Sequence, residues 1–467
     1  MCALAETSAV GQEGDLADRG RTRWKAFVAS VIVLLGLFAR AQANAEEPAR
    51  VSSYSGDVIT RSTLTGDWLG ARNALAEKGI TFDASVTQIT QGVVRGGKDS
   101  GWEYGGRGDL TGTLDTQKLG LWPGGFLNVE LEGNWTNSVN RSTGGLAPAN
   151  TNQLFPVPGG DNVALPALSF AQFLSHYVGG IVGKQDTMSG DANEFAHGKG
   201  DKQFLNLAFN INPVALVVPY STLGTGVIVL PTADPNQAIL DFLVLSATGK
   251  ATTDGFDDLN GAIFSGGGRV RTHFFGLTGH QLVSVFYSNK QYNSIDQRIQ
   301  FEPGRPGLDP AGAQVLEKKR DTWAMFYNFD HFLYETDASA GKGVGLFGRF
   351  GASAGNPNPM QYFYSLGVGG KGLIPSRDRD RFGIGAYYTS VENPTLQLPF
   401  RGPSSFLGDE WGFEAFYNVA LTPWVLLTPD IQVIGPSQKR RLVSGGTSGT
   451  ATIGTATVLG FRVQLLL

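Results

Sequence analysis

The sequence contains one cysteine, Cys2, among its 467 residues. A single cysteine excludes a disulfide-stapled scaffold and a zinc or iron–sulfur site built from cysteines. Charged residues are scarce as well, at 17%, whereas ordinary globular domains carry about 25%. The formal net charge is -4, so no basic excess exists to neutralise phosphates and no nucleic-acid partner is expected.

Long apolar runs are missing too. After the first 45 residues no stretch approaches the roughly 20 apolar residues that a transmembrane helix needs. Glycine, in contrast, is abundant: 64 residues, close to twice the average usage of about 7%. The glycines have no period of three, which excludes collagen. This composition indicates extensive β-structure with many tight turns.

The first 45 residues have the pattern of an export signal. Basic residues between 19 and 25 precede an apolar run over 26–39, and two Ala-x-Ala sites follow at 41–45. The apolar run is too short to span a bilayer as a helix. The pattern therefore predicts a cleaved signal peptide over residues 1–45.

Residues 46–79 are predicted to form an N-terminal periplasmic segment with a short helix. The helix is expected over 64–79 because four apolar residues fall on one helical face: Leu64, Trp68, Ala71 and Leu75. Thr65 or Asp67 would cap its start, and Gly79 would end it.

Residues 80–467 show alternating segments instead of helical periodicity. In 456–467, Leu459, Phe461 and Val463 occupy one face, while Arg462 and Gln464 occupy the other. Such alternation over about ten residues is typical of a strand that has lipid on one side and water on the other. We find 17 such segments: 80–91, 105–115, 126–134, 168–174, 176–184, 203–211, 225–230, 237–246, 268–274, 280–292, 320–330, 344–352, 361–369, 380–390, 410–419, 423–434 and 456–467.

The fold class predicted from these segments is all-β, a 16-stranded antiparallel transmembrane β-barrel. Sixteen is chosen because closed bacterial barrels have an even number of strands. A soluble β-sandwich also alternates, but its inner face is the apolar one. The apolar faces here carry Trp and Tyr rings that suit the lipid headgroup region, which favours the barrel. A secreted soluble β-rich sugar-binding protein stays as the alternative.

In a barrel, the polar faces of the strands line the lumen. The charged residues expected to point inward and to line the pore are Glu130, Glu132, Arg269, Arg271, Arg349, Glu414, Asp430 and Arg462. Opposed charges across a constriction can form hydrogen bonds with hydroxyl groups. The aromatic residues expected to stack on a sugar ring are Trp102, Tyr104 and Phe347.

No motif predicts catalysis, a cofactor or a metal site. The segment Gly351–Gly355 matches the G-x-S-x-G pattern around Ser353, which needs a helix directly after the serine. Pro357 and Pro359 follow instead and stop a helix. An outer-membrane hydrolase that uses Ser353 is thus a weak alternative, and we expect no enzyme.

Three stretches of the chain resemble the carbohydrate-selective porin family of the OprB type. They are Leu64-Thr-Gly-Asp-Trp-Leu-Gly-Ala-Arg72, Val182-Gly-Lys-Gln-Asp186 with Gly190–Phe195, and Leu421-Thr-Pro-Trp424 with Leu427–Gln432. They occur in family order, so the resemblance extends over about 62–467. The chain departs from the pattern at Gly435-Pro436, where Asn-Pro is expected, and at Leu467, where an aromatic residue is usual.

The resemblance implies an outer-membrane porin of a Gram-negative bacterium that passes mono- or oligosaccharides by passive diffusion into the periplasm. Its expected partners are small-molecule carbohydrates, outer-membrane lipid, the barrel-assembly machinery and further copies of the chain in a homo-oligomer. The resemblance also implies that the N-terminal helix lies at the periplasmic side. A general or anion-preferring diffusion channel is the main alternative, in which Arg269, Arg271 and Arg349 would dominate the constriction.

Overall fold

The computed structural model describes residues 54–158, 162–256, 259–298, 317–394, 396–397, 406–443 and 449–467. The predicted signal peptide at 1–45 lies outside the described residues, as does the start of the predicted periplasmic segment. Among the described residues, no helix combines the length and the apolar character needed to cross a membrane.

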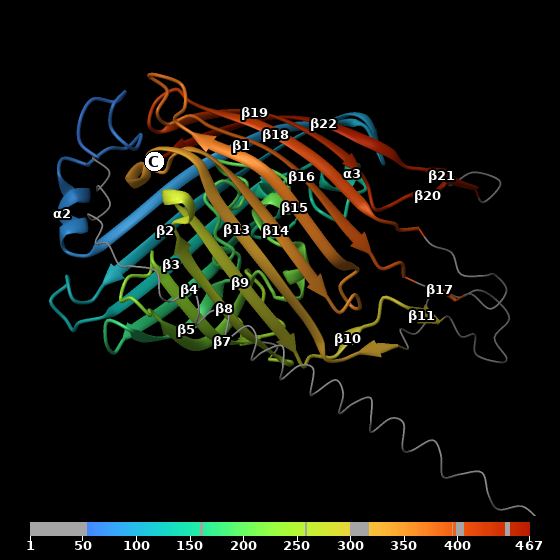
Figure 1. The fold of residues 1–467 in the computed structure, drawn as a ribbon, viewed down its shortest axis with the longest axis horizontal. Helices are drawn as coiled ribbons and strands as arrows, with labels where there is room; N and C mark the ends of the chain where they lie inside the picture. Colours follow the sequence, from blue (N-terminus) through green and yellow to red (C-terminus); the bar gives the residue numbers. More distant parts are fainter. Residues whose placement is uncertain are drawn as a thin grey trace, which may run out of the picture. The chain divides into compact units, whose positions relative to one another are not determined.

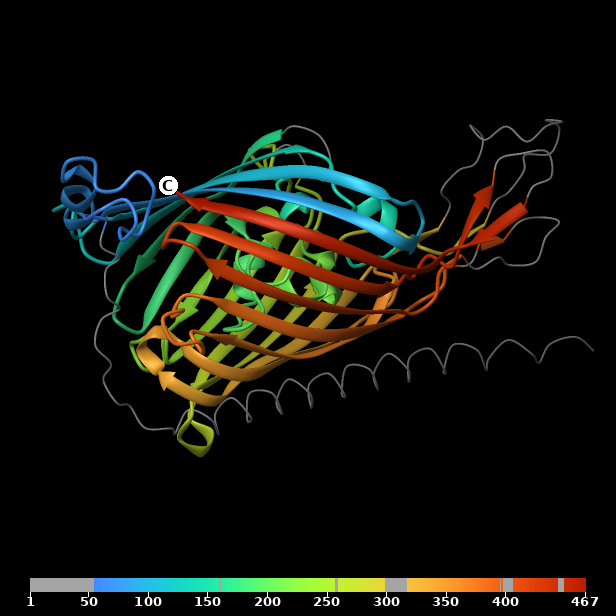
Figure 2. The ribbon, with the colours of Figure 1, turned by 90° about the horizontal axis from the view of Figure 1, so that it is seen from above.

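Sixteen strands form one closed barrel in which each strand is antiparallel to its neighbours (Figures 1 and 2). Pairing of the first strand with the last closes the barrel. This confirms the predicted 16-stranded antiparallel barrel. The strands are β1 (Ile80–Gly97), β2 (Gly101–Asp115), β3 (Gly125–Thr136), β4 (Asn162–Phe173), β5 (Val178–Asp186), β6 (Ser221–Val229), β7 (Ala238–Ser246), β8 (Ala262–Thr272), β9 (Gly279–Ser288), β13 (Thr322–Asp337), β14 (Lys342–Ser353), β15 (Met360–Lys371), β16 (Arg381–Val391), β18 (Glu410–Ala420), β19 (Val425–Gly435) and β22 (Gly454–Leu466).

The connections at the two ends of the barrel differ in length. At the end that carries α2 (Ala71–Glu77) and the C-terminus, strands are joined by short turns (Figure 2). The longest connections lie at the other end and contain three small sheets: β10 (Tyr292–Asn293) with β12 (Lys318–Lys319), β11 (Gln297–Arg298) with β17 (Leu396–Gln397), and β20 (Arg440–Val443) with β21 (Gly449–Thr452). Barrels of the outer membrane place their short turns in the periplasm.

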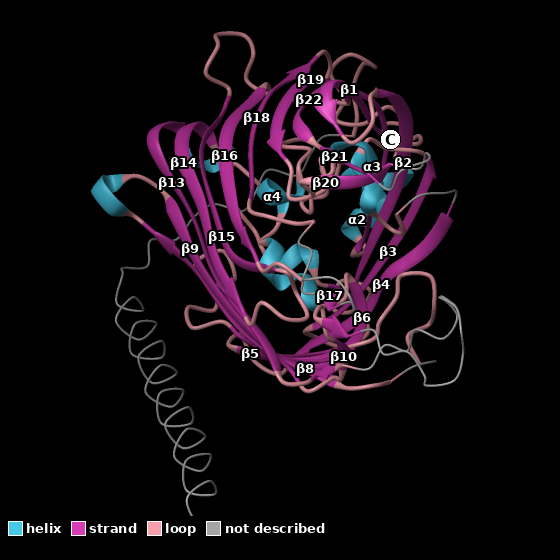
Figure 3. Ribbon diagram, turned by 90° about the vertical axis from the view of Figure 1, so that its right-hand side faces the viewer, coloured by secondary structure: helices cyan, strands magenta, loops and turns pink. Residues whose placement is uncertain are grey.

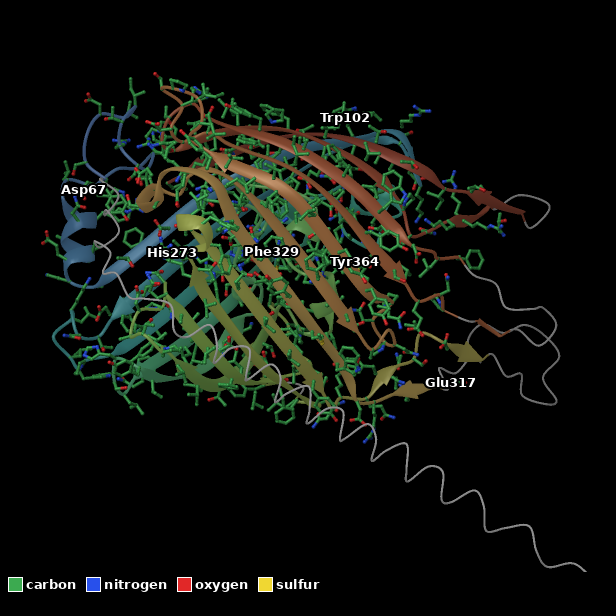
Figure 4. All side chains as sticks on the ribbon, viewed as in Figure 1. Asp67, Trp102, His273, Glu317, Phe329 and Tyr364 are labelled. Carbon is green, nitrogen blue, oxygen red and sulfur yellow. The ribbon has the colours of Figure 1, made fainter. Side chains whose placement is uncertain are left out.

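The alternation predicted from the sequence is present in the wall. In β22, Arg462 and Gln464 are buried on the inside while Leu459 and Phe461 are exposed on the outside. Aromatic rings gather on the outer surface of β13, β14 and β15, where Phe350 lies 6.2 Å from Phe329 and 6.1 Å from Tyr364, measured between ring centroids (Figure 4). An apolar, aromatic outer face is the surface that lipid requires.

One predicted strand is wrong. Residues 203–211 alternate like a strand but contain α4 (Leu207–Asn210), a short helix inside the barrel. Asn206 caps it by accepting a hydrogen bond from the backbone N–H of Ala208. Phe204, Leu207 and Phe209 are all fully buried, so this segment has no face toward water.

The predicted N-terminal helix is shorter than expected. It spans α2, and not 64–79, because Trp68 and Leu69 have left-handed backbone angles, φ 49° and 60°, that an α-helix cannot contain. Asp67 nevertheless contacts its first turn, since its Oδ1 accepts the N–H of Asn73 at 2.8 Å. Gly79 follows the helix with φ 83°, a conformation that glycine adopts without strain.

Arg72 in α2 binds the N-terminal segment to the closing seam of the barrel. Its side chain is 2% exposed and donates to the carbonyl of Leu467 at 2.9 Å and of Phe82 at 2.9 Å. Nearby, the N–H of Leu64 donates to the carbonyl of Leu466 at 2.8 Å. The segment before β1 is therefore attached where β1 meets β22.

Candidate functional site

The connection between β5 and β6, residues 187–220, folds into the barrel, and we call it the inner loop (Figure 3). It contains η2 (Met188–Gly190), α4 and η3 (Pro213–Val217). Its Phe204 packs against Phe347 of β14 at 5.3 Å and Phe416 of β18 at 4.8 Å between ring centroids. The lumen thus contains an apolar core that fixes this loop to one side of the wall.

Arg349 of β14 attaches the inner loop to the wall. Its guanidinium is fully buried and lies 3.1 Å from the carboxylate of Asp191. It also donates to the carbonyl of Phe209 at 3.0 Å and to that of Ala196 at 2.6 Å. Arg349 therefore faces inward, as predicted, but the inner loop covers it, so the prediction that it lines the open pore is corrected.

Two more predicted pore residues hold the inner loop in the same way. Glu414 accepts the backbone N–H of Leu205, and that of Asn206 at 2.9 Å. Arg462 donates to the carbonyl of Gly200 at 2.7 Å and to that of Gln203 at 2.9 Å. Both side chains are fully buried. Charge-assisted bonds to backbone are among the stronger hydrogen bonds in proteins, so these residues position the loop.

Asp430 belongs to this buried group as well. Its Oδ1 accepts a hydrogen bond from the side-chain amide of Gln432 at 3.0 Å. The residue is 5% exposed. Asp430 lies on the inward side of β19 and is buried there, and its role in lining the pore stays a prediction.

A second connection, residues 137–158 after β3, also enters the lumen. It contains α3 (Asn140–Thr143) and η1 (Asn152–Leu154). Glu410 of β18 accepts hydrogen bonds from two backbone N–H groups of this connection, those of Leu146 at 2.6 Å and Ala147 at 3.1 Å. Inward carboxylates on β18 therefore fix both connections.

Lys199 of the inner loop is the centre of a charged cluster. Its ammonium lies 2.6 Å from the carboxylate of Glu130 and 2.7 Å from that of Asp186, and it also binds Glu132. The hydroxyl of Tyr220 completes the group and donates to Glu132 at 2.6 Å. Burial alone would lower the pKa of Lys199, but the carboxylates outweigh it and hold that pKa well above its ordinary value.

Arg107 of β2 extends this cluster. It is fully buried and lies 2.8 Å from the carboxylate of Asp109 and 2.8 Å from that of Asp201. Asp201 also accepts from the side-chain amide of Asn152 at 2.7 Å. Acid and base thus alternate across the lumen from the β2–β3 wall to the inner loop.

A cavity of about 630 Å³ opens beside this cluster. Charges of both signs line it: Arg107, Lys199 and Lys202 together with Asp83, Asp109, Glu130, Asp186 and Asp201. Hydroxyl groups of Ser62, Thr63 and Ser85 and the ring of Tyr54 lie at its α2 side. Such a space offers hydrogen-bond donors and acceptors on several sides at once.

Of the predicted pore charges, Glu130 lines this cavity and Glu132 lies directly behind it, bound to Lys199. Arg269 and Arg271 are partly buried and lie on the inward side of β8, but they do not line the cavity beside Lys199. Glu194 of the inner loop interacts electrostatically with Arg269. The role of both arginines in the pore stays a prediction.

The three predicted sugar-stacking residues are placed elsewhere. Trp102 is 57% exposed on the outer wall (Figure 4). Tyr104 follows it on the same face of β2, opposite to the inward Arg107, and is 46% exposed. Phe347 faces inward but is fully buried against Phe204 and Phe209. None of the three side chains can stack on a sugar in the lumen, so this prediction is corrected.

Ser353 ends β14, as the sequence indicated. Its hydroxyl donates to the carbonyl of Met360 at 2.9 Å and accepts the N–H of Gly355 at 3.1 Å. The residue is buried at the start of a turn and no helix follows it.

Sequence reasoning missed Arg107, Lys199 and Asp201. Arg107 lies within the predicted strand 105–115, and its alternation with Trp102 could have identified it as inward. Lys199 and Asp201 lie in a loop that has no periodicity, so only their proximity in space identifies them.

The family model described as "Carbohydrate-selective porin, OprB family" matches residues 99–466. The chain belongs to this family. It is therefore an outer-membrane carbohydrate porin, a channel of Gram-negative bacteria. Family membership agrees with the closed barrel and with the charged lumen described above.

Solved OprB structures have the same fold. The high-pH structure of Pseudomonas putida OprB is 18% identical, with a TM-score of 0.69, over 88% of this chain and 99% of that chain. Its low-pH structure is 15% identical, with a TM-score of 0.54, over the same shares. No curated protein sequence matches this chain.

Proposed function

We propose that neutral mono- and oligosaccharides cross this OprB-family barrel by passive diffusion and pass the cavity beside Lys199. The observation that carries this proposal is the mixed lining of that cavity by acids, bases and hydroxyls. An uncharged polyol can donate to Glu130 and accept from Lys202, so it can exchange hydrogen bonds with water for bonds with the wall. Solute moves down its gradient, so transport needs no cofactor and no covalent step.

Weak binding is part of this function, because a solute that enters must also leave. The ion pairs of Lys199 with Glu130 and Asp186 already satisfy most of the charge in the cluster. The groups that a sugar hydroxyl could bind therefore already have hydrogen-bond partners in the protein, which favours a short residence time of the sugar in the cavity.

The Glu130→Gln variant tests this arrangement. It removes one negative charge beside Lys199 and Arg107, and a single charge in a solvated cavity is worth about 1 kcal/mol. We therefore expect the anion-to-cation permeability ratio to rise roughly fivefold, with altered rates of liposome swelling for disaccharides. Glu77→Gln on the exposed side of α2 makes the same charge change away from the lumen and should alter neither value. Unchanged selectivity and unchanged swelling in Glu130→Gln would remove this cavity from the sugar path.

A general or anion-preferring channel is the second candidate, and a basic group in the lumen favours it. Arg381 and Lys371 interact electrostatically with Glu194 of the inner loop, on the side of the lumen that holds Arg269. Strong anion selectivity in planar bilayers, without block of the ion current by sugars, would support this candidate against the sugar path.

We also propose that residues 1–45 are removed as a signal peptide, that residues 46–79 form a periplasmic segment before the barrel at 80–467, and that the barrel-assembly machinery inserts the chain into outer-membrane lipid. Homo-oligomer formation is part of the same proposal. Mass spectrometry of the purified mature protein in detergent would test both the cleavage site and the number of copies.

A further inference from the structure

A second cavity, of about 280 Å³, lies between the inner loop and the wall formed by β5 to β9. Most of its lining is apolar, from residues such as Ile181, Leu243 and Phe286. Phe155 and Tyr220 form a ring pair in its lining, with centroids 4.1 Å apart. The two cavities share Asp186, Met188 and Ser189, so they lie on either side of the start of the inner loop.

The charges of the second cavity have one sign. Its charged lining residues are Asp186, Asp191 and Asp241, with no lysine or arginine among them. Asp186 is paired with Lys199, and Asp191 is paired with Arg349. Within the described residues, no hydrogen bond or ion pair reaches the carboxylate of Asp241. A carboxylate in an apolar cavity without a partner attracts a cation.

The wall places a hydroxyl group close to Asp241. Gly267 of β8 is paired with Asp241 on one side and with Ser284 of β9 on the other. A Cβ atom at residue 267 would lie 2.8 Å from Asp241 Oδ1 and 3.2 Å from the Ser284 hydroxyl. The absence of a side chain at residue 267 therefore lets a carboxylate and a hydroxyl approach the same point of the wall, where an ammonium group in the cavity could bind both.

Two buried amides add donors to the same cavity. The side-chain nitrogens of Gln185 and Asn212 have no hydrogen-bond partner among the described residues. Both residues line the cavity, and their side chains are at least nine-tenths buried. Unpartnered buried donors are costly, so a ligand with oxygen acceptors would be favoured here.

The nearest inward cation of β8 does not neutralise Asp241. Arg269, two residues from Gly267, interacts electrostatically with Asp330 and Glu194. It does not line the second cavity. The negative charge of Asp241 therefore stays available to a ligand.

We propose that this second cavity binds protonated amino sugars, with the ammonium group between Asp241 and Ser284. The ring hydroxyls would accept from Gln185 and Asn212, and the less polar C–H face of the ring would contact the pair of Phe155 and Tyr220. The inference rests on the proposed passage of sugars and assigns to the lumen a preference for cationic over neutral sugars.

Three probes that differ at one substituent test the proposal: glucosamine, glucose and N-acetylglucosamine. At neutral pH, where most of the amine is protonated, glucosamine should block the single-channel ion current at a concentration about tenfold lower than the two neutral sugars, because a hydrogen-bonded charge pair is gained. In Asp241→Asn this advantage should disappear, while glucose swelling rates stay unchanged. Asp234→Asn, in the exposed turn before β7, makes the same charge change and should keep the advantage.

The outcomes separate this inference from the sugar path itself. Equal block by all three sugars in the wild type, or an advantage of glucosamine that survives in Asp241→Asn, would overturn the amino-sugar site while glucose transport remains. Gly267→Ala gives a second route, because its methyl group would lie too close to Asp241 and Ser284 and would displace both, which should also remove the advantage. Heat-modifiable mobility of each variant in gels shows that the barrel has formed.

Discussion

Replacing Arg349 with methionine should release the inner loop. Arg349 makes one ion pair with Asp191 and donates to the carbonyls of Phe209 and Ala196, all in a fully buried position. Breaking a buried pair by removing one partner costs about 3–5 kcal/mol. If this cost falls on docking of the loop, the docked-to-undocked ratio decreases by a factor of about 10² to 10³.

Single-channel recording and liposome swelling measure that release. We expect a larger and noisier conductance and entry of larger oligosaccharides, while heat-modifiable mobility stays normal, because the backbone pairing of β14 does not depend on the Arg349 side chain. Arg95→Met, at an exposed position of β1, controls for the loss of charge. The double variant Arg349→Met with Asp191→Asn should regain part of the docking, because no charge is then left buried and unpaired.

An Arg349→Met channel whose conductance and size limit equal those of the wild type would contradict this prediction. Such a result would mean that the apolar contacts of Phe204 and Phe209 hold the loop without the guanidinium. If Arg349→Met fails to form a barrel, conductance and size limit are measured in the double variant, which has no unpaired buried charge.

Three further predictions follow from the same geometry. Trp102→Ala should leave sugar swelling rates unchanged, because Trp102 lies on the outer wall; a clear loss of sugar flux would return it to the lumen. Wild-type conductance should persist as pH rises through the range near 10.4, where an ordinary lysine loses its proton. The pKa of Lys199 is raised, so its ion pairs are lost only as the pH passes that raised value. The Glu132→Gln variant should lose conductance at a lower pH than the wild type, and identical titrations of the two proteins would contradict this prediction. Phe209→Ala should cost about 3–5 kcal/mol of packing, all of it in the inner loop, so proteases should cut the loop while the barrel mobility in gels persists; resistance equal to the wild type would contradict it.

Much of the wall could be predicted from the sequence, because lipid and water impose a strict period of two on each strand. Glu414 and Phe413 are a clear example: their opposite burial follows directly from alternation. The inside could not be predicted in the same way. Residues 203–211 alternate like a wall strand, and nothing local distinguishes a segment facing lipid from one enclosed in an apolar core.

For the candidate site, the sequence predicted only which side chains point into the barrel. Alternation places Arg349, Glu414 and Arg462 inside, but whether an inward side chain meets water depends on where a distant loop settles. Lys199 shows the converse case. Its role depends on three carboxylates of β3 and β5, and no sequence pattern around residue 199 predicts contact with those strands.

The inner loop is bonded to strands on several sides of the barrel, from Arg107 on β2 through Arg349 on β14 to Arg462 on β22. The circumference set by sixteen strands and the width of the passage are consequently independent properties of this porin. The size and charge limits on solutes can change through residues 187–220 alone, while the lipid-facing surface and the order of strand pairing remain the same.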